Sequence, residues 1–268
     1  MDNFASKKAK LHNLLLTAPS PAVAYSGGID STLVLYLAQQ LWPEKALGIL
    51  VKSEAQSERE IQAALALVRE HQLRVEVVEI SVLAIPKVAR NDKKRCYHCK
   101  RAMLRAIKEV AAAKGREVVY DGSNADDQSQ YRPGAQALAA EKVVSPLQLC
   151  GFTKTNVRHY AKELGLKNWP KPSVPCLLTR FPYDRAEPIN PDQLRQIDQG
   201  EASLSQVCQD NFRLRWERPD AVRLEVSPGD MSRIIGAREE LLTALRNLGF
   251  KQVTLDLAPF KSGSFDRQ

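Results

Sequence analysis

With 268 residues, of which 44% are hydrophobic and 26% charged, the chain has the composition of a globular protein. At about 150 residues per domain, it holds one large domain or two unequal ones. Five cysteines, an odd number in a chain of this size, argue against a secreted disulfide scaffold and predict a reducing, cytoplasmic location. No apolar run approaches the ~18 residues that a membrane span requires. The net charge of +8 favours anionic partners such as nucleotides, phosphates or RNA, or else reflects a solvated basic surface.

The first two thirds of the chain alternate between strand and helix patterns. Apolar residues at helical spacing mark 33–41, 61–68, 103–110 and 157–164. Short apolar runs predict strands at 22–25, 46–51, 75–80, 118–120 and 143–144. This alternation predicts an α/β fold with a parallel sheet covered by helices on both faces.

A proline-rich stretch, 169–175, interrupts this rhythm, because its three prolines exclude a helix interior or a central strand. It predicts a first domain at 1–168, a junction at 169–180 that carries Cys176, and a smaller α+β domain at 181–268. Within the last domain, the patterns predict helices at 194–207 and 231–248, and strands at 212–216, 221–226 and 253–255.

A glycine loop, Ser26-Gly27-Gly28-Ile29-Asp30-Ser31, connects the first predicted strand to the first predicted helix. Such a turn faces the ligand crevice of an open parallel sheet, and its glycines allow a close approach to an anion at the positive end of the helix. It matches neither the Walker A nor the dinucleotide-binding pattern. It resembles, at every specified position, the PP loop (Ser-Gly-Gly-x-Asp-Ser) of ATP pyrophosphatases, which cleave ATP between its α and β phosphates. The alternative is a turn that serves only the fold.

A second polar loop, 121–127, follows the strand at 118–120. The same resemblance implies that this loop lies near the nucleotide and its Mg²⁺, which prefers hard oxygen ligands. The expected ATP and magnesium ligands in the two loops are Ser26, Gly27, Gly28, Asp30, Ser31, Asp121, Ser123, Asn124 and Asp127. For the second loop, the alternative is an Asx-rich turn.

Three cysteines carry a second candidate chemistry. Cys96 and Cys99 form a Cys-x-x-Cys pair, which is half of a metal site, a redox pair or simply two inert thiols. Cys176 follows the prolines, which hold the chain extended and present one thiol at the junction. Arg180 and Lys171 favour its thiolate form. The other two cysteines, Cys150 and Cys208, match no motif and are expected to be small core residues.

Over most of its length the chain resembles the LarE-type sulfur transferases. The matching stretches are Ser26–Ser31, Arg95–Lys100, Asp121–Asp127, Tyr131–Gly134, Ser145–Leu147, Trp169–Arg180, Phe212–Arg215 and Val222–Glu225. The resemblance implies that a carboxylate of pyridinium-3,5-biscarboxylate mononucleotide is adenylated by ATP and converted to a thiocarboxylate, for the nickel-pincer nucleotide cofactor of lactate racemase. It also implies a homo-oligomer, such as a hexamer. Neither a membrane nor a nucleic acid is expected as a partner.

Two sulfur sources are known in this family. In one branch a single cysteine, at the position of Cys176, gives up its sulfur and becomes dehydroalanine. In the other, three cysteines hold a 4Fe–4S cluster that carries the sulfur. The resemblance favours the second branch here, with Cys96, Cys99 and Cys176 as the cluster ligands. Three thiolates would leave one iron open, whereas ordinary clusters take four cysteines.

Arginines supply a candidate receptor for the phosphate of such a substrate. Arg213 and Arg215 alternate along one predicted strand and therefore share a face, and their forked guanidinium groups suit phosphate. Arg180 at the junction completes this set, and the alternative for the strand pair is a solvated face. Glu201 and Glu225 match acidic positions of the family whose role the resemblance leaves open.

Three other functions remain as alternatives. A PP-loop tRNA thiolase would fit the positive charge, but the usual loop of thiolases with this cysteine arrangement has Lys where Ile29 stands here. It would show salt-sensitive tRNA binding. An amide-forming synthetase would need ammonia and would not need Cys176. A nucleotide-binding regulator without catalysis would release no pyrophosphate.

Overall fold

The computed structural model describes residues 4–129, 133–167 and 174–260. Residues 169–173 of the predicted junction, together with Tyr131 and Arg132, lie outside the described residues. The chain forms two compact units. The first comprises Met1–Ser53, Glu60–Val82 and Lys94–Val174, and the second Glu54–Arg59, Leu83–Lys93 and Pro175–Gln268. Two short segments from the first third of the chain thus belong to the second unit.

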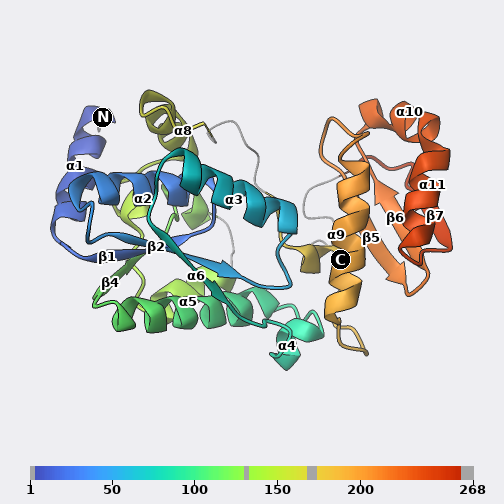
Figure 1. Ribbon diagram of the computed structural model, residues 1–268, viewed down its shortest axis with the longest axis horizontal. Coiled ribbons are helices and arrows are strands. Elements are labelled where there is room, and N and C mark those ends of the chain that lie inside the picture. The colour runs from blue at the N-terminus through green and yellow to red at the C-terminus, as the bar shows by residue number, and fades with distance from the viewer. Residues whose placement is uncertain (1–3, 130–132, 168–173, 261–268) are drawn as a thin grey trace. The chain divides into compact units, whose positions relative to one another are not determined.

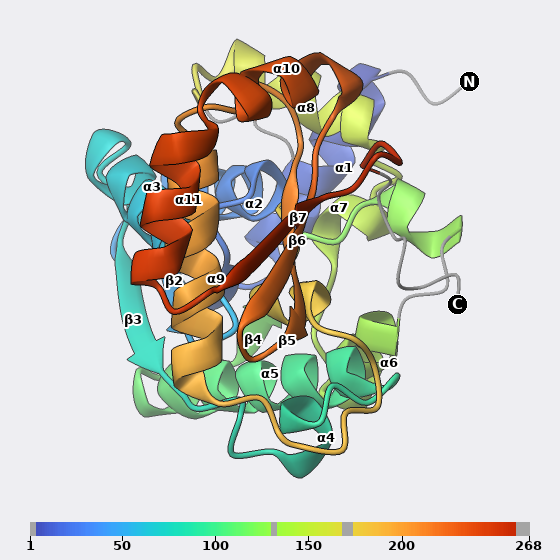
Figure 2. The same cartoon turned by 90° about the vertical axis from the view of Figure 1, so that its right-hand side faces the viewer.

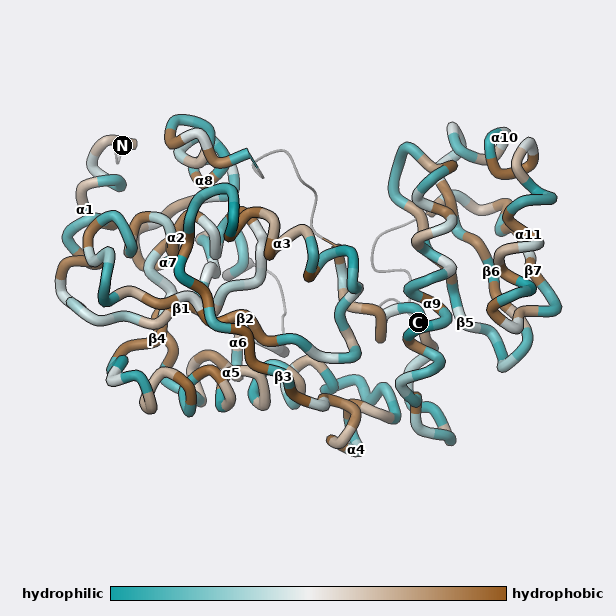
Figure 3. The backbone as a smooth tube through the Cα atoms, viewed as in Figure 1, coloured by the Kyte–Doolittle hydropathy of each residue, from teal (hydrophilic) through white to brown (hydrophobic). Residues whose placement is uncertain are grey.

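The first unit contains a parallel four-stranded sheet in the order β3-β2-β1-β4 (Figure 1). Its strands are β1 (Pro21–Tyr25), β2 (Leu47–Lys52), β3 (Val75–Glu79) and β4 (Val118–Tyr120). The central strands β1 and β2 are buried nearly throughout and mostly hydrophobic (Figure 3), as expected for strands covered on both faces. The predicted strand at 143–144 is reduced to a single parallel bridge between Val144 and Tyr120.

Helices cover both faces of this sheet, which confirms the predicted α/β class (Figure 1). One apolar cluster joins the sheet to α1, α2, α3, α7 and α8, and a second joins it to α5 and α6. The helices are α1 (Phe4–Leu16), α2 (Ile29–Leu41), α3 (Glu58–Glu70), α5 (Arg95–Ala113), α6 (Pro133–Ala140), α7 (Pro146–Leu149) and α8 (Lys154–Glu163). The strand order reverses between β1 and β4, and at such a switch point the carboxyl ends of the strands form a ligand crevice.

The second unit is a small α+β module. Its sheet has the order β5-β6-β7, with β5 and β6 antiparallel and β6 and β7 parallel. Helices α9 and α11 pack side by side along this sheet (Figure 2). The elements are α4 (Pro86–Ala89), η2 (Leu177–Arg180), α9 (Pro191–Leu204), β5 (Arg213–Arg218), β6 (Ala221–Glu225), α10 (Pro228–Gly236), α11 (Arg238–Asn247) and β7 (Gln252–Leu255).

Glycines lie at two local features of this module. The helix predicted over 231–248 is interrupted at Ala237, which has φ −94° and ψ 15° and follows Gly236, the last residue of α10. Gly200 in α9 faces β5, and a Cβ atom there would lie 2.4 Å from a methyl group of Leu214. A side chain at position 200 would therefore require the buried Leu214 to shift, so glycine permits this close contact between α9 and β5.

No helix among the described residues is both long and apolar enough to traverse a bilayer.

A buried carboxylate stabilises the second unit. Asp230 is fully buried, accepts hydrogen bonds from the backbone N–H groups of Gln209 (3.1 Å) and Asp210 (2.9 Å), and pairs with Arg233 at 2.9 Å. Ser227, the N-cap of α10, donates its hydroxyl to the same carboxylate. Burial alone would raise the pKa of Asp230, but the hydrogen bonds from Asp210, Gln209, Arg233 and Ser227 outweigh it and hold the pKa below its usual 3.8.

Replacing this carboxylate by an amide, Asp230→Asn, is expected to lower the free energy of unfolding by about 2 kcal/mol at pH 7, because hydrogen bonds to a charged group are weakened. Since the folded state lowers the pKa, the contribution is complete above pH ~4 and disappears as the pH falls through the folded pKa. Urea unfolding of both proteins at pH 7 and at pH 3 measures this difference. If the two proteins differed in their free energy of unfolding by the same amount at pH 7 and pH 3, the ionised carboxylate of Asp230 would not be the stabilising group.

Candidate active site

The PP loop lies between β1 and α2, with Ser26, Gly27 and Gly28 outside both elements. Gly27 has φ +73°, and a Cβ atom on it would lie 2.4 Å from the Cβ atom of Ala64 in α3. Both the left-handed backbone and the contact with α3 require glycine at this position. The loop therefore places its backbone at the carboxyl end of β1, directly before the positive N-terminus of α2.

The two predicted phosphate-binding hydroxyls lie within the same turn. Ser31 Oγ lies 3.1 Å from Ser26 Oγ, accepts from the backbone N–H of Ser26 at 3.1 Å, and donates to the carbonyl oxygen of Gly28 at 3.0 Å. Thr32 Oγ1 donates to that same oxygen at 2.9 Å. These bonds hold the loop in shape and keep both serine hydroxyls beside the start of α2, where they suit phosphate oxygens.

The second predicted loop packs directly on the first. A Cβ atom on Gly122 would lie 2.6 Å from the backbone nitrogen of Ser31, so the two backbones touch at this point. Asn124 donates to Asp30 Oδ1 at 3.0 Å and is itself positioned by Asp127, which accepts from its backbone N–H at 3.0 Å. The fold thus brings Asp30, Asn124 and Asp127 together.

Asp121 is buried and organises the second loop from within. Its carboxylate accepts hydrogen bonds of 2.6 Å from the hydroxyls of both Ser123 and Ser145, and Lys100 Nζ lies 3.8 Å away. The carboxylate is therefore surrounded by donors of this chain. This arrangement gives Asp121 a supporting role for the loop, and Asp30 and Asp127 stay the predicted magnesium ligands.

Lys154 is a site residue that the sequence patterns did not indicate. It is the first residue of α8, whose N-cap Thr153 and Asn156 form a reciprocal capping box. Its ammonium group forms an ion pair with Asp30, and its backbone N–H donates to Asp126 at 2.7 Å. The capping pattern in 153–156 marks the start of this helix, but only the packing of α8 reveals that Lys154 reaches the PP loop.

The Cys-x-x-Cys pair lies in the first turn of α5. Cys96 is exposed and Cys99 is partly exposed, and their spacing of three residues places both thiols on the same side of the helix.

Two other cysteines match no motif. Cys150 is buried as expected, and burial raises the pKa of its thiol. Cys208 is only partly buried, and burial together with the charge of Asp230 raises its pKa to about 11.

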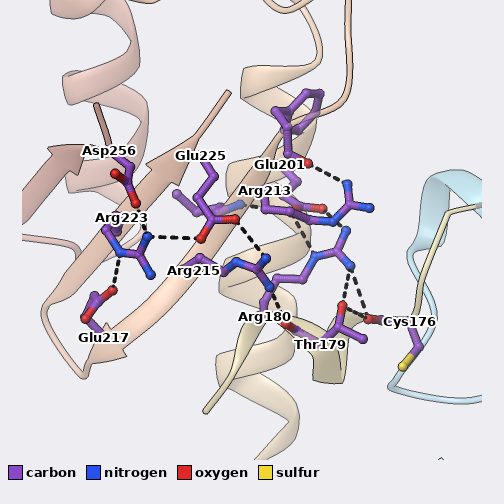
Figure 4. A network of polar contacts seen from close by, with 12 residues as sticks. Cys176, Thr179, Arg180, Glu201, Arg213, Arg215, Glu217, Arg223, Glu225 and Asp256 are labelled. Carbon is purple, nitrogen blue, oxygen red and sulfur yellow. Dashed lines mark hydrogen bonds and ion pairs between the residues drawn. The ribbon is translucent and has the colours of Figure 1, made fainter. Parts of the chain in front are cut away.

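Cys176 directly precedes the short helix η2 in the second unit and is partly exposed. Its carbonyl oxygen accepts three hydrogen bonds, from the backbone N–H of Thr179 (3.1 Å), from Thr179 Oγ1 (2.8 Å) and from Arg180 Nη1 (3.2 Å). Figure 4 shows that the carbonyl side of Cys176 faces Arg180, whereas the sulfur points away from it.

The three predicted phosphate-binding arginines lie in one polar network in the second unit (Figure 4). Arg180 and Arg215 are buried and form ion pairs of 2.7 Å and 2.8 Å with Glu201 and Glu225, respectively. These pairs assign to the two glutamates a role that the sequence left open: each neutralises a buried arginine. Burial of either guanidinium group without a carboxylate partner would strongly destabilise the folded state.

Arg213 differs from its two neighbours because its side chain is partly exposed. Its guanidinium lies over the ring of Phe260, 4.8 Å from the centroid, and Nη1 donates to the carbonyl oxygen of Phe212. Burial, followed by the positive charge of Arg180, lowers the pKa of Arg213 to about 10. Arg213 is therefore charged at neutral pH, and it is the member of the set best able to meet an anion from solution.

The proposed cluster ligands are divided between the two units, with Cys96 and Cys99 in the first and Cys176 in the second. Within the described ranges, no three His, Cys, Asp or Glu side chains are grouped so that they could hold a metal ion. The chemistry of the three thiols suits an iron–sulfur cluster, and their joint role stays a prediction.

Comparison with known proteins places this site in a family. The family model of NAD synthase matches residues 17–171, which include both loops. The pyridinium-3,5-bisthiocarboxylic acid mononucleotide synthase of Lactiplantibacillus plantarum is 32% identical over 264 residues, covering 98% of this chain and 95% of that protein. This chain belongs to the LarE-type family of PP-loop proteins.

Two uncharacterized proteins also match the LarE-type chain over nearly their full length. One, slr1717 of Synechocystis sp., is 34% identical over 91% of each chain. The other, MJ0830 of Methanocaldococcus jannaschii, is 31% identical over 97% of this chain and 99% of its own. Membership of this family, together with the intact PP loop, makes the protein an ATP-dependent sulfurtransferase.

Proposed function

We propose that this LarE-type protein converts a carboxylate of pyridinium-3,5-biscarboxylate mononucleotide into a thiocarboxylate during synthesis of the nickel-pincer nucleotide. The observation that carries the proposal is the 32% identity to a synthase of the bisthiocarboxylic acid nucleotide, which extends over both units of the chain. The PP loop supplies the ATP chemistry that such a reaction requires, because a carboxylate oxygen leaves only after activation.

The residues of the first unit suit adenylation. The PP loop would hold the β and γ phosphates, which leave as pyrophosphate, while the substrate carboxylate attacks the α phosphorus. Asp30 and Asp127 would hold a magnesium ion, which offsets the charge that develops on the phosphates. Lys154, paired with Asp30, supplies a further positive charge at the same place. The acyl adenylate is then open to attack by a sulfur nucleophile, with AMP as the leaving group.

For the sulfur source, we propose a 4Fe–4S cluster held by Cys96, Cys99 and Cys176. The support is chemical: three thiols that are at least partly exposed, two of them on one helical turn. When bound, a cluster with only three thiolate ligands has an iron with an open position for sulfide. The competing proposal is sacrifice of Cys176, in which its Cβ–S bond breaks and dehydroalanine remains.

Anaerobic purification followed by iron and sulfide analysis, and by mass measurement after turnover, separates these sources. The cluster proposal expects about four iron atoms per chain and an unchanged mass of the polypeptide. Cys96→Ala and Cys176→Ala are expected to lose iron, whereas Cys150→Ala and Cys208→Ala serve as matched controls and keep it. Loss of H₂S at Cys176 without bound iron would overturn the cluster proposal and support sacrifice.

Substrate phosphate is proposed to bind at Arg213, with the buried Arg215 behind it. Arg213→Gln is expected to raise the KM for the mononucleotide about 10- to 100-fold, the effect of losing one charge-assisted hydrogen bond. Arg218→Gln is the matched control, because Arg218 lies on the same strand and pairs with Asp220 at the surface. It is expected to leave KM within about twofold, since exposed ion pairs contribute little. An equal effect of both substitutions would contradict this assignment.

A tRNA thiolase is the second candidate, favoured by the charge of +8. Binding of tRNA that weakens steeply with added salt would support it, because phosphate contacts release counterions. Pyrophosphate release that depends on the mononucleotide and not on tRNA would exclude it.

A further inference from the structure

The guanidinium of Arg180 is engaged on two sides. Nε and Nη2 donate to the two carboxylate oxygens of Glu201 at 2.9 Å and 2.7 Å, a bidentate pair. Nη1 faces the opposite way and lies 3.0 Å from the carbonyl oxygen of Pro175, 3.2 Å from that of Cys176 and 2.8 Å from Thr179 Oγ1. The residue is 1% exposed. A phosphate could reach this guanidinium only by displacing bonds that are already made inside the protein.

Glu201 in turn is anchored to the sheet. Besides its pair with Arg180, Oε1 accepts the backbone N–H of Leu214 in β5 at 3.0 Å. The carboxylate therefore connects helix α9, strand β5 and the turn that carries Cys176. A buried ion pair of this kind contributes little net stability. It fixes the relative position of its two partners, because a buried charge without its partner is strongly destabilising.

The far side of the same turn is held as well. Leu177 donates its backbone N–H to the carbonyl oxygen of Ala55 at 2.8 Å. The fully buried Asn91 donates from Nδ2 to the carbonyl oxygens of Leu178 (3.2 Å), Phe181 (2.9 Å) and Pro182 (2.9 Å). These contacts explain why segments 54–59 and 83–93 belong to the second unit. The backbone at Cys176 is thus fixed from both directions, whereas its sulfur points away from the arginine (Figure 4).

We propose that Arg180, anchored by Glu201, is a positioning residue that fixes the backbone of Cys176 and thereby the direction of its Cα–Cβ bond for sulfur transfer, and that it does not bind the substrate phosphate. This role rests on the proposed sulfur transfer through Cys176. It holds whether the thiol ligates a cluster or reacts itself, since both require a defined direction of the Cα–Cβ bond. A displacement of about 1 Å at a reacting group costs on the order of 100-fold in rate.

The first test needs no substrate. Amide hydrogen exchange is compared in the wild type, Arg180→Met, Arg180→Lys and Asp230→Asn. Arg180→Met is expected to raise exchange at residues 177–181 at least about 10-fold, because the turn loses its anchor. Asp230→Asn is the matched control: it removes a buried carboxylate of the same unit whose partners are Gln209, Asp210, Ser227 and Arg233. Because it destabilises the unit as a whole, it is expected to raise exchange at 177–181 no more than at the other buried amides of the unit, whereas Arg180→Met raises it selectively.

The second test separates the two half-reactions with pyridinium-3,5-biscarboxylate mononucleotide and ATP. Arg180→Met is expected to lower kcat for thiocarboxylate formation about 100-fold, with the KM and rate of pyrophosphate release within about twofold of wild type. Arg180→Lys keeps a donor for the carbonyl oxygens, so its kcat for thiocarboxylate formation is expected to be at least about tenfold higher than that of Arg180→Met. If Arg180→Met does not fold, Arg180→Lys carries both tests.

Three outcomes would overturn the proposal. The first is unchanged amide exchange at 177–181 in both Arg180 variants. The second is a raised KM of the mononucleotide in the pyrophosphate-release assay, which would assign Arg180 to phosphate binding. The third is wild-type thiocarboxylate formation by Arg180→Met. If the wild-type protein itself releases no pyrophosphate with the mononucleotide, the proposed substrate fails, and the exchange experiment still decides whether Arg180 fixes the turn.

Discussion

Replacing Cys176 with serine is expected to lower thiocarboxylate formation by at least about a thousandfold, which corresponds to about 4 kcal/mol, while pyrophosphate release continues at the wild-type rate. The residues expected to bind ATP lie in the PP loop and in the loop at 121–127, both in the first unit, whereas Cys176 lies in the second. A hydroxyl at this position is a far weaker nucleophile and metal ligand than a thiolate. Parallel assays of pyrophosphate and of thiolated product measure the two steps separately.

Cys150→Ser and Cys208→Ser are the controls for this experiment, because neither residue lies in a stretch shared with the family. The raised pKa of both thiols keeps them protonated and unreactive at neutral pH. Wild-type thiocarboxylate formation by Cys176→Ser would remove the basis for sulfur transfer through this residue. Loss of pyrophosphate release as well would instead place Cys176 in the adenylation site.

Adding a methyl group at Gly122 is the second change with a large expected effect. A Cβ atom there would lie 2.6 Å from the backbone nitrogen of Ser31 and 3.0 Å from the carbonyl carbon of Asp30. Both neighbours are backbone atoms at the start of α2, so relief requires that the two loops separate. Such overpacking costs about 1–3 kcal/mol, and here it displaces the groups expected to hold the pyrophosphate. Gly122→Ala is therefore expected to weaken ATP binding about 100-fold.

Calorimetric titration with ATP measures this effect, and thermal unfolding shows whether the fold persists. Gly236→Ala is the matched control, because a Cβ atom at Gly236 meets nothing within 4 Å and the residue lies at the end of α10, in the other unit. Wild-type ATP affinity in Gly122→Ala would show that the contact between the loops does not shape the nucleotide site.

Hydrophobic periodicity and turn residues predict the strands, helices and loops whose form depends on residues that are neighbours in the chain. The buried runs of β1 and β2, separated by a helix, predict a parallel sheet because such strands need cover on both faces. The PP loop was identified from six consecutive residues, since the chemistry of a glycine turn between a strand and a helix is entirely local. The break at Ala237 leaves no such local pattern, because the helical periodicity of the apolar residues continues across it.

The partners of the buried charges were decided by tertiary structure alone. Arg180 meets Glu201 21 residues later in the chain, and Lys154 meets Asp30 across 124 residues. Nothing in the spacing of such residues specifies the pairing, because α9 and α8 bring them together only when their apolar faces pack. The sequence by itself thus determined the fold class, the family and the positions of the loops and thiols. Tertiary packing decided which arginine is held by which glutamate, because ion pairs form wherever the packed elements bring opposite charges into contact.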